Sequence, residues 1–150
     1  MHGGFGGLGA DTILGGTSDT AAGRQFLTGG ADAHHFVFLP GDSPPEEFEA
    51  TVITDFGTMQ DKIDLLIPGS PTNYLEDSIP QDDFLKALAK AQEILLEGPI
   101  YVFIAGPVNG WLFGDLDPHC APDHVLGLND FAVVISNADD LTKFDFLDIV

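Results

Sequence analysis

Apolar residues alternate with polar or glycine residues in the amino-terminal part of the chain, and a period of two predicts short β-strands. Phe36 and Phe38 fall on one face of such a strand within residues 34–42. Residues 51–56 alternate in the manner of a half-buried strand. The segment between these strands, 41–50, carries two prolines and three glutamates, and this composition predicts an exposed loop.

Residues 81–97 have the period of a helix instead. Four apolar residues at helical spacing share one face and predict an element that packs against the rest of the fold: Phe84, Leu88, Ala91 and Leu95. Asp82 and Lys86 form an i,i+4 pair on the other face. Gly98 and Pro99 end the segment.

Short strands are expected again after this helix. Residues 100–105 and 111–115 flank the turn sequence GPVNG and predict a β-hairpin. Residues 124–128 and 131–136 predict two further strands. No segment predicts a second independent domain, so the pattern favours one mainly β chain with a single helix.

Glycine pairs interrupt this pattern in the first 38 residues, at 3–4, 6–7, 15–16 and 29–30. Residues 6–14, GGLGADTIL, match every fixed position of the calcium-binding nonapeptide GGxGxDxUx, in which U is a large apolar residue. The glycines allow a tight turn with positive φ, Asp11 supplies a carboxylate, and Ile13 points inward from a very short strand. The next glycine pair restarts the pattern, and the longer interval that follows predicts a bulging loop in residues 17–27.

The composition adds a strong charge imbalance. The chain has 150 residues, 44% of them hydrophobic, which is enough for the core of one domain. It has 24 acidic residues against 5 Lys and Arg, a formal net charge of −19, and bound cations are the natural means of offsetting the repulsion. Nucleic acid is excluded as a partner because phosphate binding needs clustered basic residues. The single cysteine, Cys120, cannot form an internal disulfide.

The hydropathy and the amino-terminal sequence bear on membrane insertion and on secretion. No run approaches the roughly 20 apolar residues of a membrane span, so no membrane insertion is expected. The amino-terminal sequence MHGGFGG has none of the features of a secretory signal. Gly3 and Gly4 look like the remnant of an earlier pair, which predicts that the chain is a piece or the tail of a longer protein with a domain upstream.

Five segments together carry a family resemblance, in the order in which the family shows them: 6–14, 29–38, 51–65, 111–128 and 148–150. On these segments the chain resembles the C-terminal portion of type I secreted RTX (repeats-in-toxin) calcium-binding proteins, which is related to the C-terminal domain of serralysin-type metalloproteases. The resemblance covers nearly the whole chain.

The resemblance implies a mainly β fold built on a right-handed parallel β-roll, with two nonapeptides per turn and calcium ions between the loops of successive turns. Residues 1–66 would hold a degenerate roll and its adjoining strands. Residues 67–150 would form a capping region with the helix 81–97, antiparallel hairpins and an export signal.

The resemblance also implies a set of calcium ligands: the carbonyls of Gly7 and Gly9, and the carboxylates of Asp11, Asp19, Asp32 and Asp55. Calcium takes 6–8 oxygen ligands, and bare glycine turns expose their carbonyls to it. The second repeat, GGADAH, departs from the family pattern because Asp32 holds a glycine position and His34 holds the aspartate position. Imidazole is a poor ligand for a hard cation, so few ions are expected.

A second acidic segment has the spacing of a calcium loop, with Asp115, Asp117 and Asp123 at its first, third and ninth positions. His119 and Cys120 occupy its centre, where the family has an acidic residue and glycine. A plain acidic loop is therefore preferred over a calcium site here. Zinc held by His119, Cys120 and His124 is a weaker alternative, because neither HExxH nor a pair of CxxC motifs is present.

These observations predict a secreted, non-enzymatic module. The chain has no GxSxG or HExxH motif and no Cys-His arrangement typical of an active site. By the resemblance, the module folds on extracellular calcium, and its last residues, KFDFLDIV, resemble an uncleaved signal for type I export machinery. One alternative is a calcium-stiffened cell-surface or adhesive module that binds through the aromatic residues Phe103, Trp111 and Phe113, although such residues usually pack in a core. Another is the non-catalytic tail of a secreted protease.

Overall fold

A computed structural model describes residues 3–15, 25–39, 42–47, 49–57, 60–65, 67–116, 126, 130–136 and 149–150. Ten strands and one helix occur in this part of the chain. In sequence order they are β1 (Gly3–Gly7), β2 (Thr12–Leu14), β3 (Phe26–Gly30), β4 (His35–Val37), β5 (Thr51–Ile53), β6 (Lys62–Asp64), β7 (Tyr74–Ser78), α1 (Phe84–Leu95), β8 (Tyr101–Ala105), β9 (Gly110–Gly114) and β10 (Phe131–Ile135). The fold is therefore mainly β, as the pattern predicts.

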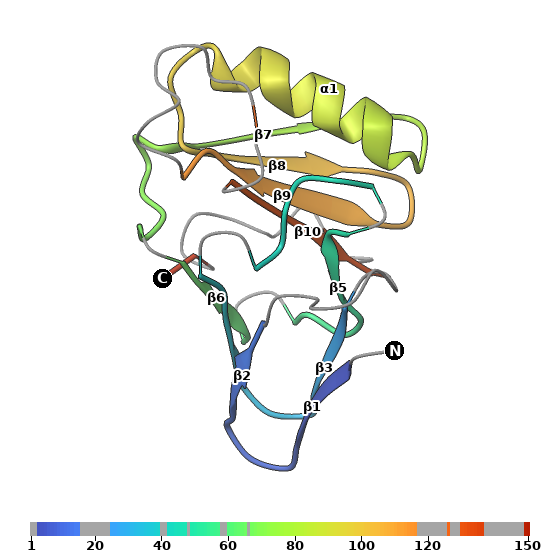
Figure 1. The fold of residues 1–150 in the computed structure, drawn as a ribbon, viewed down its shortest axis with the longest axis vertical. Helices are drawn as coiled ribbons and strands as arrows, with labels where there is room; N and C mark the ends of the chain where they lie inside the picture. The colour runs from blue at the N-terminus through green and yellow to red at the C-terminus, as the bar shows by residue number, and fades with distance from the viewer. Residues whose placement is uncertain are drawn as a thin grey trace.

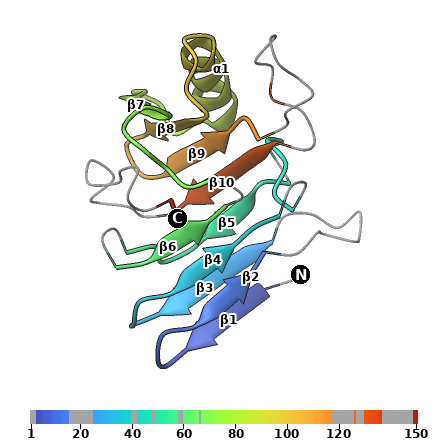
Figure 2. The same cartoon turned by 90° about the vertical axis from the view of Figure 1, so that its left-hand side faces the viewer.

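The first six strands alternate between two sheets. Strands β1, β3 and β5 are parallel neighbours in a seven-stranded sheet, and β2, β4 and β6 form a parallel three-stranded sheet. Each pair of consecutive strands, with the turn between them, makes one coil of the chain: the first coil (3–14), the second coil (26–37) and the third coil (51–64). Figure 2 shows the three coils stacked one above another.

The large sheet continues from the coils into the carboxyl-terminal region. Its strand order is β1-β3-β5-β10-β9-β8-β7, and the parallel pair of β5 with β10 joins the two parts. Strands β8, β9 and β10 are antiparallel neighbours, which confirms the predicted hairpin and the strand within 131–136. Strand β7 was not predicted. It pairs in parallel with β8, and α1 makes the crossover between them (Figure 1).

The helix is shorter than the predicted segment 81–97. It begins at Phe84 because the Asp83 side chain accepts hydrogen bonds from the backbone N–H groups of Leu85 and Lys86 and caps the first turn. Asp82, which the sequence pattern pairs with Lys86 on the helix, lies before the first helical residue. Its carboxylate accepts hydrogen bonds from the backbone and side-chain nitrogens of Asn109 at 2.9 Å each. In the described part of the chain, no helix has the length and apolar character needed to cross a membrane.

Two layers of apolar side chains hold the fold together. One lies between the two sheets, and the other lies between α1 and the large sheet, where the helix contributes Phe84, Ala87, Ala91 and Leu95. Leu88, predicted on the same face, is only partly buried at its margin. The aromatic residues of the hairpin are core residues, as expected, since Phe103, Trp111 and Phe113 are at most 2% exposed.

Two expectations about residues 41–56 are wrong. Strand β5 is buried on both faces, not on one, because it lies between β3 and β10 with an apolar layer on each side. The loop 41–50 is not simply exposed: Ser43 is buried, donates a hydrogen bond to the carbonyl of Ala132 and accepts one from the backbone N–H of Thr51. The strand expected at 124–128 lies outside the described residues, apart from the partly buried Leu126.

Candidate metal site

The turn of the first coil has the conformation that its glycines predict. Strand β1 ends at Gly7 and β2 begins at Thr12. Gly7 and Gly9 have φ values of 100° and 96°, in the region that favours glycine. Ile13 is buried between two exposed neighbours, so the expected inward position of this side chain is confirmed.

Strand pairing aligns the second turn with the first. Gly7 pairs with Gly30, and Thr12 pairs with His35. Asp32 therefore lies at the position of Gly9 and His34 at the position of Asp11, as the comparison of the two repeats predicts.

The same register brings in a residue that the sequence analysis missed. His35 pairs with Lys62, so Asp61 occupies in the third turn the position that Asp11 and His34 occupy in the first and second. A local signal for it exists in the sequence, because Asp61 precedes Lys62 and Ile63 just as Asp11 precedes Thr12 and Ile13. The glycine pair is missing from the third turn, and this hides the similarity.

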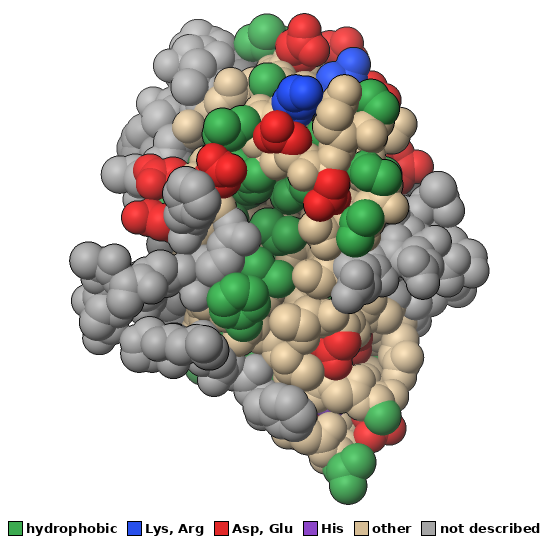
Figure 3. Space-filling view, turned by 90° about the vertical axis from the view of Figure 1, so that its right-hand side faces the viewer, with side chains coloured by type: hydrophobic (Ala, Val, Ile, Leu, Met, Phe, Trp, Pro, Cys, Tyr) green, Lys and Arg blue, Asp and Glu red, His purple; other side chains and the backbone are tan. Residues whose placement is uncertain are grey.

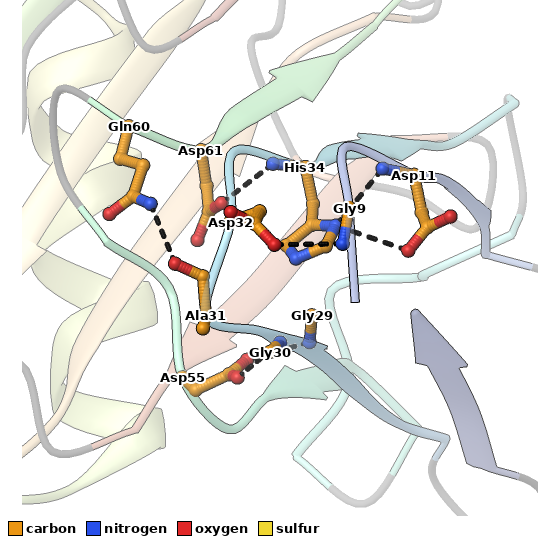
Figure 4. A network of polar contacts seen from close by, with 10 residues as sticks. All are labelled: Gly9, Asp11, Gly29, Gly30, Ala31, Asp32, His34, Asp55, Gln60 and Asp61. Atoms are coloured by element: carbon orange, nitrogen blue, oxygen red, sulfur yellow. Dashed lines mark hydrogen bonds and ion pairs between the residues drawn. The ribbon is translucent and has the colours of Figure 1, made fainter. Parts of the chain in front are cut away.

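We name the contact between the turns 6–11 and 29–34 the first junction. Two hydrogen bonds from backbone to side chain close it: Gly9 N–H donates to Asp32 Oδ2 at 2.7 Å, and Asp11 N–H donates to His34 Nδ1 at 3.2 Å (Figure 4). The imidazole of His34 is fully buried. Because its Nδ1 accepts a hydrogen bond, the proton of the neutral ring lies on Nε2.

Two polar atoms at the first junction have no hydrogen-bond partner among the described residues, namely Asp11 Oδ2 and His34 Nε2. The Asp11 side chain as a whole is 37% exposed, but its Oδ2 atom is buried, 3.7 Å from His34 Nδ1. An unpaired buried carboxylate oxygen is costly, so this atom needs a hydrogen-bond donor or a cation.

We name the contact between the turns 29–34 and 55–61 the second junction, and it is closed more completely. The Asp55 carboxylate accepts the N–H groups of Gly29 and Gly30 across it, and the Asp61 carboxylate accepts that of His34, all at 2.8 Å. Asp61 also accepts the N–H group of Gly57 within its own turn, at 2.8 Å. Two further contacts cross it: Gln60 Nε2 donates to the carbonyl of Ala31, and the hydroxyls of Thr28 and Thr54 share a hydrogen bond.

Burial governs the electrostatics of Asp61. The residue is 2% exposed, and loss of solvation raises the pKa of its carboxyl above the usual value. The hydrogen bonds from the backbone N–H groups of Gly57 and His34 oppose that rise, whereas the charge of Asp55 adds to it. The folded chain therefore favours the charged form of Asp61 less than water does.

The first junction offers oxygen donors that suit calcium. A β-carbon added to Gly6 would lie 3.2 Å from Asp11 Oδ2 and 2.6 Å from the carbonyl oxygen of Gly29, so both oxygens approach the bare face of this glycine. Hard oxygen donors fit calcium, but the imidazole of His34 does not add to them. Within the described ranges no three His, Cys, Asp or Glu side chains gather as a metal-binding group, so main-chain carbonyls would have to complete the ligand set.

Two other predicted ligands are described, Asp55 and Asp115, and they lie in different parts of the fold. Asp55 approaches the second turn as expected, but both of its oxygens accept backbone N–H groups. Asp115 follows β9, which is antiparallel to β10, so it lies at the end of the sheet opposite to the stacked turns. Asp19, Asp117 and Asp123 lie outside the described residues, as do the candidate zinc ligands His119, Cys120 and His124.

Comparisons with protein-family models, curated proteins and solved structures give no match to this chain.

Proposed function

We propose that this chain is a calcium-dependent folding module of the RTX type, in which the three coils form a right-handed parallel β-roll and calcium binds at the first junction. One observation carries the proposal: Asp11 Oδ2 is buried without a hydrogen-bond partner, and this atom and the carbonyl oxygen of Gly29 both approach the bare face of Gly6. Asp11, the Gly29 carbonyl and neighbouring turn carbonyls would hold the ion, which supplies positive charge and a bridge between two coils.

The charge of the molecule supports a cation as the missing component. The net charge is −19, and Figure 3 shows acidic side chains spread over the face drawn there, with basic ones near its upper end. Cation binding reduces this repulsion only in the folded state, where the turns are stacked. Calcium at about 100 times its dissociation constant would stabilise the fold by roughly 2.7 kcal/mol per site.

Stability that depends on calcium suits a protein that is exported unfolded. Where free calcium is scarce, the first junction lacks its bridge and the coils separate more easily. Outside the cell, calcium would close the junction and favour the folded state. We therefore assign the chain to a secreted or cell-surface protein, non-enzymatic in this part, with calcium and type I export machinery as its partners.

The burial of the hairpin aromatic residues weakens the alternative of an adhesive module. It relied on the aromatic side chains of the C-terminal hairpin as a binding surface, and Phe103, Trp111 and Phe113 are buried in the two apolar layers.

Thermal unfolding in calcium, magnesium and chelator tests the proposal. Calcium should raise the Tm by about 5–10 °C, whereas magnesium at equal concentration should have a smaller effect because its octahedral shell fits turn carbonyls poorly. Asp11→Asn should remove most of the calcium response. Glu97→Gln, which removes the same charge from an exposed position after α1, should preserve it. Identical melting curves in calcium and chelator would contradict the proposal.

A further inference from the structure

The end of the chain adds a short extended segment to the outer edge of β6. Ile149 forms a parallel bridge with Ile63. Val150 N–H donates to the carbonyl of Ile63 at 2.9 Å, and Leu65 N–H donates to the carbonyl of Val150 at 3.1 Å. Figures 1 and 2 both place the C-terminus beside β6, at the level where the coils meet β10.

A second segment, after β6, contacts Ile149. Gly69 N–H donates to the carbonyl of Ile149 at 2.9 Å, so the chain end lies between β6 and the residues that follow it. The Ile149 side chain is 2% exposed and belongs to the apolar layer between the two sheets, together with Ile63. Val150 is 37% exposed. One side chain therefore anchors the chain end, and the other faces outward.

We propose that the outer edge of β6, with Gly69, is an internal docking site for the extended apolar segment 149–150, and that folding of the third coil withdraws this segment from any protein that binds it. As far as that protein is export machinery, the inference rests on the function proposed above. The docking site itself rests on the hydrogen bonds and the burial alone.

The consequence is competition between folding and recognition of the terminus. The docking edge exists only when the third coil has formed, because Ile63 and Leu65 must present their backbone groups in register. A protein that binds Ile149 and Val150 in extended form binds the unfolded chain and shifts the equilibrium toward it. The exporter would then bind the unfolded chain and no longer bind the folded module.

Amide hydrogen exchange on the whole chain tests the docking site. In the folded protein the amides of Leu65 and Gly69 should exchange slowly, like those of β8. Ile149→Asp should speed exchange at both amides by about tenfold or more, because a charge cannot replace the buried side chain. Val150→Asp adds the same charge one position later, where the side chain faces outward, and should leave both amides protected. Slow exchange of the β8 amides verifies that each variant is folded.

Digestion with carboxypeptidase Y then tests withdrawal of the terminus. Release of Val150 and Ile149 from the unmodified chain should be slow when it is folded and fast when it is unfolded in urea. Fast release from the folded chain, fast exchange of Leu65 and Gly69 in it, or unchanged protection in Ile149→Asp would overturn the inference.

Performing both measurements with calcium and with chelator separates the two proposals. Protection of Leu65 and Gly69 that is equal in both media, with no calcium effect on stability, would remove the calcium function and keep the docking site. A fold that calcium stabilises, but in which residues 149–150 are not protected, would keep the calcium function and remove the docking site.

Discussion

The first and second junctions join the same kind of turn in different ways. At the second junction, Asp55 and Asp61 together accept three backbone N–H groups of the second turn, so carboxylates hold the two turns directly. Asp61 accepts a fourth N–H group, that of Gly57, within its own turn. At the first junction, Asp32 and His34 accept one each, and a carboxylate oxygen and an imidazole nitrogen stay buried without hydrogen-bond partners among the described residues.

The difference shows that an acidic residue in a glycine turn can serve either of two purposes. A carboxylate that faces the N–H groups of the preceding turn acts as a direct clamp, since charged acceptors form strong hydrogen bonds. Under the proposed function, a carboxylate oxygen that has no such donor, such as Asp11 Oδ2, binds calcium instead. We therefore expect calcium to act on the first junction and to leave the second almost unaffected.

The largest effect is expected from a β-carbon placed inside the first junction. Gly30 has φ of 114°, and an added β-carbon would lie 2.5 Å from the carbonyl oxygen of Gly7. Gly30→Ala should lower the free energy of unfolding by about 2–5 kcal/mol, from backbone strain and overpacking together. Gly9→Ala is the matched control, with φ of 96° and open space around the new atom, and should cost only about 1–2 kcal/mol. Equal losses in urea unfolding would mean that the two turns are not in close contact.

Asp61→Asn tests the second junction through its pH dependence. Because burial raises the pKa of Asp61 in the folded state, its titration favours folding below the unfolded pKa of about 3.9 and loses that contribution as pH rises through the folded pKa. The stability of the unmodified chain relative to Asp61→Asn should therefore be largest in acid and fall toward neutral pH. Chemical unfolding in chelator at a series of pH values measures this difference. A difference that grows with pH would show that hydrogen bonding, not burial, dominates at this carboxylate.

His34→Asp should increase the difference in calcium response between the two junctions, because it gives the first junction the oxygen ligand that the repeat pattern has at this position. Calcium affinity should rise by about tenfold, because a carboxylate is a hard ligand and adds charge next to Asp11. His35→Asp adds the same charge at the exposed neighbouring position and should change the affinity much less. Isothermal titration compares the two variants. Equal gains would indicate a general charge effect and no defined site at position 34.

The smallest effect is expected far from both junctions. Replacing Asp115 and Asp117 together by Asn should leave the calcium stoichiometry unchanged, because Asp115 lies at the opposite end of the sheet and His119 and Cys120 reduce the donor count of that segment. Only a small loss of affinity from the altered long-range field is expected. Titration that shows one ion fewer would establish a second calcium site there.

The sequence by itself determined the local features of this protein. Residues 6–14 specify a turn with positive φ followed by an inward isoleucine, because only glycine adopts these angles without strain. The apolar period specifies the helix, and the turn sequence GPVNG specifies the hairpin. Strand β7 was missed because four of its five residues are exposed and give no apolar alternation.

The tertiary structure decided what each acidic residue faces. Asp11 and Asp61 have the same local sequence pattern, yet one carboxylate oxygen of Asp11 is buried without a hydrogen-bond partner while the carboxylate of Asp61 accepts two N–H groups. The donors to Asp32, Asp55 and Asp61 include groups 23 to 27 residues away, so they are set by strand register and not by neighbours in sequence. Register depends on how the apolar faces of all three coils pack together, and no single repeat contains that information.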